Sequence, residues 1–82
     1  MTDNTIFTTH AIEEIDLSGE DTTLIYKVVL NKIFNKYFLT VYRKHDDGWG
    51  LYVNKIDVLE TFSREDAENE FKHRCAIYRG EA

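Results

Sequence analysis

The segment YRKHDDGWGLYV, at residues 42–53, holds more chemically capable side chains than any other stretch of the sequence. His45, Asp46 and Asp47 are consecutive, and such a group could ligate a metal ion or share general acid–base catalysis. A structural zinc site needs paired His and Cys ligands, and an EF-hand needs acids at alternate positions with a closing glutamate. The segment contains neither arrangement, so we predict no metal site and no cofactor.

The same segment carries a strong turn signal. Asp47-Gly48 lies between two runs of alternating apolar residues, and Asp-Gly in that setting is typical of a tight β-hairpin, because both residues tolerate positive φ. We therefore interpret the segment as a bend, with His45 and Asp46 flanking the turn and facing water.

The remaining nucleophile and acid–base candidates point away from catalysis. Cys75 lies on an apolar stripe, which favours a small buried hydrophobe over a nucleophile. His73 is two residues from Cys75, about 200° around a helix, so the two cannot chelate one ion. The sequence has no glycine-rich phosphate loop or nucleophile elbow. We expect that the protein is not an enzyme.

Three segments rich in β-branched and aromatic residues predict strands, at residues 23–31, 36–44 and 49–59. The connection between the first two is expected between Leu30 and Tyr37, where Asn-Lys dipeptides occur. In the third segment the apolar alternation changes phase at Asn54-Lys55, which predicts a bulge or kink that returns the apolar residues to one face.

Residues 63–80 predict a helix. Ser63 is a natural N-cap, Gly80 is a terminator, and the apolar residues recur at helical spacing. These stripe residues are Ala67, Phe71, Cys75 and Tyr78. The segment at residues 5–17 fits either a strand that enters a hairpin through Ser18 to Asp21 or a short helix, and we favour the strand.

The predicted fold is one α+β domain spanning residues 1–82, because a chain of this length has room for one core. It comprises a small antiparallel meander of three or four strands, with one C-terminal helix packed on one face. The expected core residues are Leu39, Val41, Leu51, Val53, Ala67, Phe71 and Cys75.

Charge is unevenly distributed along the chain. Residues 1–26 hold six acids and no Lys or Arg, whereas the other 56 residues hold ten bases and nine acids. We expect an acidic N-terminal edge. The six acids are Asp3, Glu13, Glu14, Asp16, Glu20 and Asp21.

The sequence predicts a cytoplasmic protein without a membrane segment. The first ten residues carry no base and lead into no long apolar stretch, so neither a signal peptide nor a transit peptide is expected. One cysteine allows no intrachain disulfide, which agrees with a reducing compartment.

Both faces of the predicted sheet are partly apolar, and one helix can cover only one of them. The second face is then covered by the N-terminal segment, by a second copy of the chain, or by a partner. We expect a non-enzymatic protein binder that docks onto a partner with a basic surface, such as a nucleic-acid-binding effector. The expected partner-binding residues are Glu13, Glu14, Asp16, Glu20, Asp21, Tyr42 and Tyr52.

In its size, acidity, lack of catalytic motifs and cytoplasmic character, the chain resembles the small inhibitors encoded by phages and mobile elements, including anti-CRISPR proteins, and also bacterial immunity proteins. The resemblance covers the whole chain and is carried by no diagnostic motif, so it transfers no functional residue. It implies an inhibitor that acts by binding another protein.

A single-stranded nucleic-acid platform is the alternative function. Residues 26–55 hold six bases against Asp46 and Asp47, interleaved with aromatic residues on which bases could stack. The acidity of the whole chain makes nucleic acid the less favoured partner.

Overall fold

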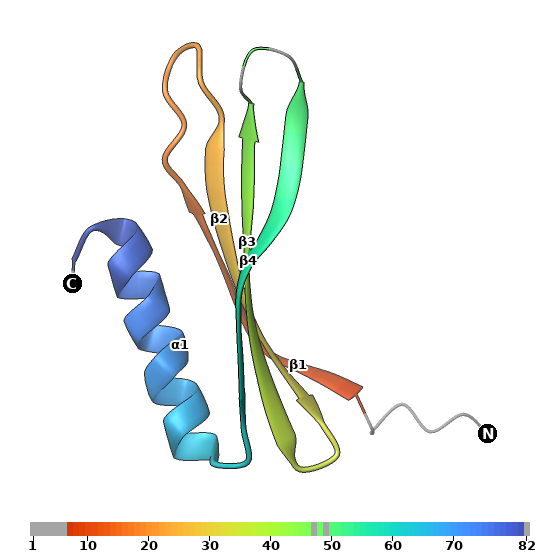
Figure 1. Ribbon diagram of the computed structural model, residues 1–82. Helices are drawn as coiled ribbons and strands as arrows, with labels where there is room; N and C mark the ends of the chain where they lie inside the picture. Colours follow the sequence, from red (N-terminus) through yellow and green to blue (C-terminus); the bar gives the residue numbers. More distant parts are fainter. Residues whose placement is uncertain (1–6, 47, 49, 82) are drawn as a thin grey trace.

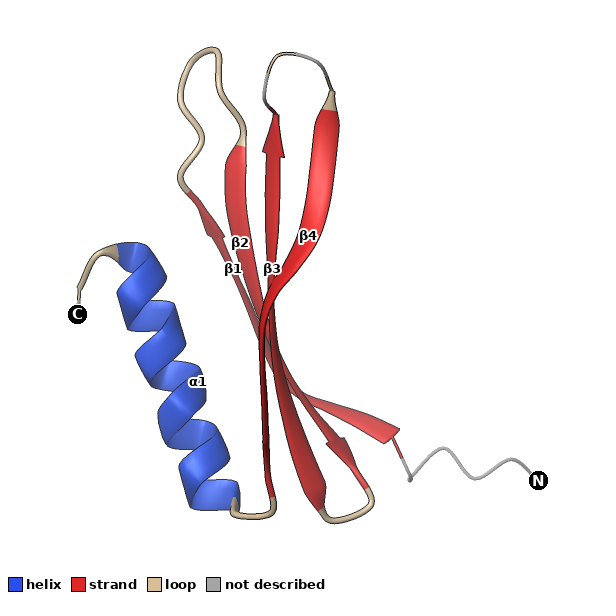
Figure 2. Cartoon of the chain, viewed as in Figure 1, coloured by secondary structure: helices blue, strands red, loops and turns tan. Residues whose placement is uncertain are grey.

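The computed structural model describes residues 7–46, 48 and 50–81. It contains four strands, β1 (Phe7–Asp16), β2 (Leu24–Ile33), β3 (Lys36–Asp46) and β4 (Leu51–Thr61), followed by the helix α1 (Arg64–Arg79). The strands pair antiparallel in chain order, so the sheet is a meander, and α1 packs against one of its faces (Figures 1 and 2). The predicted α+β fold is confirmed, with four strands.

The N-terminal segment is a strand over Phe7–Asp16, as favoured from the sequence, while residues 5 and 6 lie outside the described ranges. The strand contains a bulge, because Thr9 and Ala11 pair with the consecutive residues Asn31 and Leu30. His10 is therefore the extra residue. Its ring turns toward the helix and lies 3.1 Å from the Glu68 carboxylate.

The β2–β3 connection is the two-residue turn Phe34-Asn35, within the predicted interval. Phe34 adopts a φ of 57°, an uncommon conformation for a bulky side chain. The β3–β4 connection also lies where the sequence predicts a hairpin, although Asp47 itself is outside the described residues. There Gly48 has a φ of 91°, and its N–H donates to the Asp46 carboxylate at 2.8 Å.

The predicted irregularity in β4 is confirmed as a bulge. Val41 pairs with Asp57 and Tyr42 pairs with Lys55, which leaves Ile56 as the extra residue. Odd-numbered residues of β4 therefore face the helix after the bulge and face away from it before the bulge.

The bulge also explains an error in the predicted core. Leu51 and Val53 do share a face with Val58, but it is the face away from the helix, where Leu51 is 56% and Val53 63% exposed. Both core predictions are wrong. Leu39, Val41, Ala67 and Cys75 are buried as predicted, and Phe71 packs half-buried against them.

The helix begins and ends as the sequence indicates. The Ser63 hydroxyl accepts from the Asp66 N–H at 3.2 Å, and Gly80 caps the other end with a φ of 80°. Its stripe completes a core built on β2 and β3. The buried residues of that core are Ile15, Val28, Leu30, Tyr37, Leu39, Val41, Ala67 and Cys75. In the described part of the chain, no helix has the length and apolar character needed to span a membrane.

Glu68 links the helix to the outer strand. Its carboxylate accepts from Arg64 at 3.0 Å as well as facing His10, and these hydrogen bonds, that of His10 first, lower the pKa of Glu68 from its ordinary value of 4.5. A carboxyl with a lowered pKa in the folded state stabilises the fold above its unfolded pKa, and this contribution is lost as the pH falls through the folded pKa.

Glu68→Gln should therefore lower the melting temperature at neutral pH, because the neutral amide cannot replace the charged hydrogen bonds. The difference from the parent protein should close as the pH falls through the lowered pKa of Glu68, since both side chains are then uncharged. Thermal melts across a pH series measure this. A difference that stays constant in acid would show that Glu68 acts through packing alone.

Leu39→Ala should destabilise the fold by about 2 to 5 kcal/mol, because it removes a fully buried side chain between the helix and the sheet. Leu51→Ala is the matched control in the same sheet and should change stability by less than about 0.5 kcal/mol. Urea denaturation of both variants tests the burial assignment, and equal losses would contradict it.

Candidate protein-binding surface

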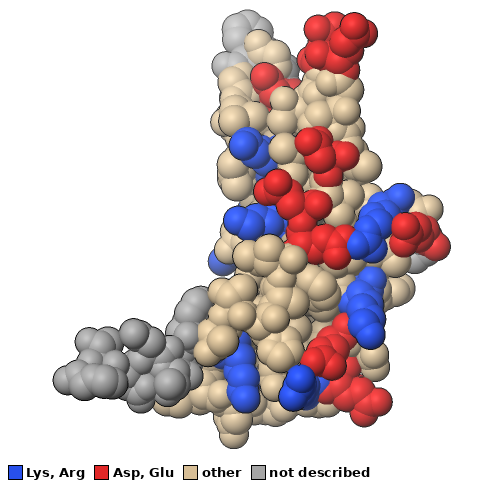
Figure 3. Space-filling model, turned by 180° about the vertical axis from the view of Figure 1, so that it is seen from behind, with Lys and Arg blue, Asp and Glu red and all other residues tan. Residues whose placement is uncertain are grey.

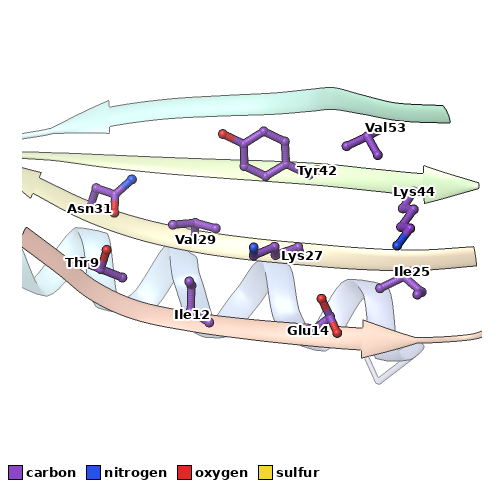
Figure 4. A pocket seen from close by; sticks show the side chains of 10 residues that line it. All are labelled: Thr9, Ile12, Glu14, Ile25, Lys27, Val29, Asn31, Tyr42, Lys44 and Val53. Carbon is purple, nitrogen blue, oxygen red and sulfur yellow. The ribbon is translucent and has the colours of Figure 1, made fainter.

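The sheet face opposite α1 is uncovered by any element in the described part of the chain, and we call it the open face. It forms a shallow groove of about 530 Å³ (Figure 4). Side chains of all four strands line this groove. They are Thr9, Ile12, Glu14, Ile25, Lys27, Val29, Asn31, Tyr42, Lys44 and Val53.

One row of paired residues across the open face is charged. Glu14 pairs with Lys27, Lys27 with Tyr42, and Tyr42 with Lys55, one residue from each strand in order. Residues directly opposite each other in an antiparallel sheet point to the same side. The row therefore has its acid on the β1 edge and a base on the β4 edge.

The next row is apolar apart from one hydroxyl. Ile12, Val29, Thr40 and Val58 are paired in sequence across the four strands. Val29 and Thr40 are nearly covered by their neighbours, whereas Ile12 is 54% and Val58 49% exposed on the edge strands. Large apolar side chains exposed on one face, here at its two edges, are typical of a contact surface.

A second surface lies at the end of the sheet where two connections meet. The β1–β2 and β3–β4 connections lie side by side there (Figure 1), joined by a hydrogen bond of 3.2 Å from the Asp46 N–H to the Thr23 carbonyl. This end exposes acids and apolar side chains together, and we call it the acidic tip. It comprises Asp16, Leu17, Glu20, Asp21, Asp46, Leu51 and Tyr52.

The acids of the tip have no ion-pair partner among the described residues. None of its four carboxylates forms an ion pair with the Lys and Arg residues that the structure describes. Figure 3 shows acidic side chains at this end of the molecule, and the basic side chains visible in that view begin further along the sheet. The tip is therefore a solvent-exposed negative surface.

The loop that carries Glu20 and Asp21 is held by its own hydrogen bonds. The Leu17 N–H donates to the Leu24 carbonyl at 2.8 Å, and the Gly19 N–H donates to the Thr22 carbonyl at 3.0 Å. The Ser18 N–H donates to the Asp16 carboxylate at 2.9 Å, and hydrogen bonding to Ser18 lowers the pKa of Asp16. Asp16 stays ionised, and the loop presents its acids on a preorganised backbone.

The predicted partner-binding acids divide between the two sides of β1. Glu14 is exposed on the open face, Asp16 is exposed where that face meets the tip, and Glu20 and Asp21 are exposed on the tip. Glu13 points the other way and forms an ion pair with Arg79 of α1. The structure thus gives Glu13 a role inside the fold that sequence spacing could not reveal.

The two predicted aromatic contacts lie on opposite faces. Tyr42 lines the open-face groove (Figure 4). Tyr52 pairs with His45, and their rings stack with centroids 5.6 Å apart on the helix-bearing side of the sheet. The expectation that both belong to the uncovered face fits Tyr42 alone, while Tyr52 belongs to the acidic tip.

The described residues form no cluster of metal-ligating side chains. In residues 7–46, 48 and 50–81, no group of three or more His, Cys, Asp or Glu side chains could hold a metal ion. Cys75 is buried in the core, and its burial raises the pKa of the thiol, so the reactive thiolate is disfavoured.

No protein-family model, curated protein or solved structure matches this chain. Its function must therefore be inferred from its own residues. Among these, sequence reasoning missed Ile12, Val53, Lys55 and Val58 as open-face residues. The phase change at Asn54-Lys55 was a signal for the last three residues. It did not indicate on which face of the sheet they would lie.

Adjacent glutamates provide a matched test of the two sides of β1. Glu13→Gln should cost about 0.2 to 1 kcal/mol, a small value because its ion pair with Arg79 is partly exposed and screened by solvent. Glu14→Gln should leave the stability of the single chain unchanged, because Glu14 forms no ion pair with the described residues. Chemical denaturation at low and high salt measures both, and an equal effect of the two changes would contradict the assignment of Glu13 to the helix.

Proposed function

We propose that the protein is a non-enzymatic binder of another protein, and that the acidic tip docks onto the basic surface of a nucleic-acid-binding partner. The observation that carries this proposal is the combination, among the described residues, of carboxylates without an ion-pair partner and exposed apolar side chains at one end of the sheet. A basic groove shaped for phosphates accepts carboxylates in their place, because both are anions that accept hydrogen bonds from Lys and Arg.

The apolar members of the tip supply the anchoring contacts. Leu17 is 47%, Leu51 56% and Tyr52 43% exposed, next to the acids. Interfaces commonly bury an apolar or aromatic centre within a charged rim, and the centre contributes most of the binding energy. The acids then act mainly on orientation and association rate.

A protein of this kind acts by occupying its partner's nucleic-acid site. This mode of action agrees with the resemblance to small inhibitors of phages and mobile elements, including anti-CRISPR proteins. It requires neither a cofactor nor a catalytic residue. It also agrees with the excess of acids over bases among residues 1–26.

Capture from a nuclease-treated bacterial lysate, followed by mass spectrometry, tests the partner class. We expect the immobilised protein to retain nucleic-acid-binding proteins with basic surfaces. One purified partner is then titrated against the parent protein and against Glu20→Lys/Asp21→Lys. The double charge reversal should weaken binding at least about tenfold and flatten its salt dependence, since the electrostatic attraction is screened over about 8 Å at physiological salt.

Glu65→Lys/Glu81→Lys is the matched control, because it changes the net charge equally at exposed positions outside the tip. It should bind the partner within about twofold of the parent protein, apart from the small general effect of net charge. If both double variants bind alike, or if the Glu20→Lys/Asp21→Lys reversal leaves affinity and salt dependence unchanged, the tip does not dock.

The nucleic-acid platform is favoured by a different observation, the position of Tyr42 between Lys27 and Lys55 on the open face. Two other bases are already engaged: Lys36 pairs with Glu60, and the Lys32 ammonium lies over the Tyr37 ring. If the platform function holds, the isolated protein binds single-stranded oligonucleotides, and Lys27→Ala weakens this binding while Glu20→Lys/Asp21→Lys does not. Absence of oligonucleotide binding would reject it.

A further inference from the structure

We propose that the open face is a homodimer interface, in which two copies of the sheet pack face to face around a two-fold axis that runs along the strands between β2 and β3. This inference does not depend on the acidic tip or on its partner. It rests on the order of charges and apolar side chains across the open face.

A two-fold axis along the strands reverses the strand order of the second copy and keeps the rows level. The second copy's β1 then lies over β4 of the first, and its β2 lies over β3. In the charged row, Glu14 of each copy comes to Lys55 of the other. Lys27 of each copy likewise comes to the Tyr42 ring of the other, an arrangement that allows a cation–π contact.

The apolar row is equally self-complementary. Ile12 of each copy faces Val58 of the other, and Val29 faces Thr40. The two exposed edge side chains thus cover each other, with one pair on each side of the axis. Aligned packing of two twisted sheets, with strands about 30° apart, keeps these rows in register near the axis.

The alternative axis, running across the strands, is disfavoured by charge. It would stack β1 on β1, and with the axis at the charged row it would bring Glu14 and Asp16 of one copy toward the same acids of the other. Like charges that face each other in an interface are strongly unfavourable. The lateral separation of acid and base on the open face therefore selects the first arrangement.

The size of the face suits a dimer. Four strands about 4.8 Å apart, each contributing about ten residues with a rise of about 3.3 Å, present roughly 600 Å² per copy. Two copies together reach about 1,200 Å², the lower end of stable and specific interfaces. The Asn31 carboxamide oxygen, which is buried beside the groove without a hydrogen-bond partner in the described chain, could also accept a donor from the covering copy.

Charge reversal at Glu14 and Lys55 gives a test that an effect on the fold of one chain cannot reproduce, because two strands separate these residues within one chain. Sedimentation velocity over a concentration series should show a monomer–dimer equilibrium for the parent protein. Glu14→Lys and Lys55→Glu should each weaken self-association at least about tenfold, since each sets like charges against each other twice. An equimolar mixture of the two variants should form a heterodimer, because every contact is then again between opposite charges.

Val58→Glu and Ile77→Glu test the apolar row. Both residues are exposed, but Val58 lies on the open face and Ile77 on the helix. Val58→Glu should abolish dimerisation, and Ile77→Glu should preserve it. Circular dichroism confirms that each variant is folded.

Three results would overturn the proposal. If the parent protein stays monomeric at all concentrations, a second copy does not cover the open face, and a different protein is its partner. Single variants that dimerise as tightly as the parent would place the interface elsewhere. A mixture of Glu14→Lys and Lys55→Glu that fails to associate would exclude the two-fold arrangement.

Discussion

The structure depends on one geometric constraint: a single 16-residue helix can cover only one face of a four-stranded sheet. Burial of the α1 stripe against β2 and β3 forms the core, and this burial is the main source of stability in a chain of this size. The consequence is an opposite face whose edge strands expose Ile12, Val53 and Val58 to solvent. Both proposals follow from what the helix leaves uncovered.

Two bulges adapt the strands to this arrangement. The bulge at His10 turns that ring toward the helix, where it meets Glu68. The bulge at Ile56 reverses the alternation of β4, so Leu59 packs in the core while Val53 faces away from it. The strands thereby contribute side chains to one core, and their outer face still carries rows of charged and apolar side chains. The same face carries acids on β1 and bases on β2, β3 and β4, so a second copy can cover it without a change in shape.

Much of the fold could be predicted from the sequence, because its signals are local. The caps at Ser63 and Gly80 and the helical spacing of the stripe define α1, and β-branched runs separated by turn residues define the strands. The face to which a residue points was harder to predict, since one bulge inverts it, as for Val53. Pairing across long separations was not accessible: the ion pair between Glu13 and Arg79 joins the first strand to the end of the chain, and no local pattern indicates it.

Isotope-filtered NMR on a mixed sample of labelled and unlabelled protein tests the central claim most directly, which is that a second copy covers the open face. Ile12 and Val58 occupy the two outer strands of one chain, so their methyl groups are too far apart for an intramolecular contact. Intermolecular nuclear Overhauser effects between the methyl groups of Ile12 and Val58 are the expected result. Their absence at a concentration where the protein is dimeric, or intermolecular contacts confined to other surfaces, would contradict the account.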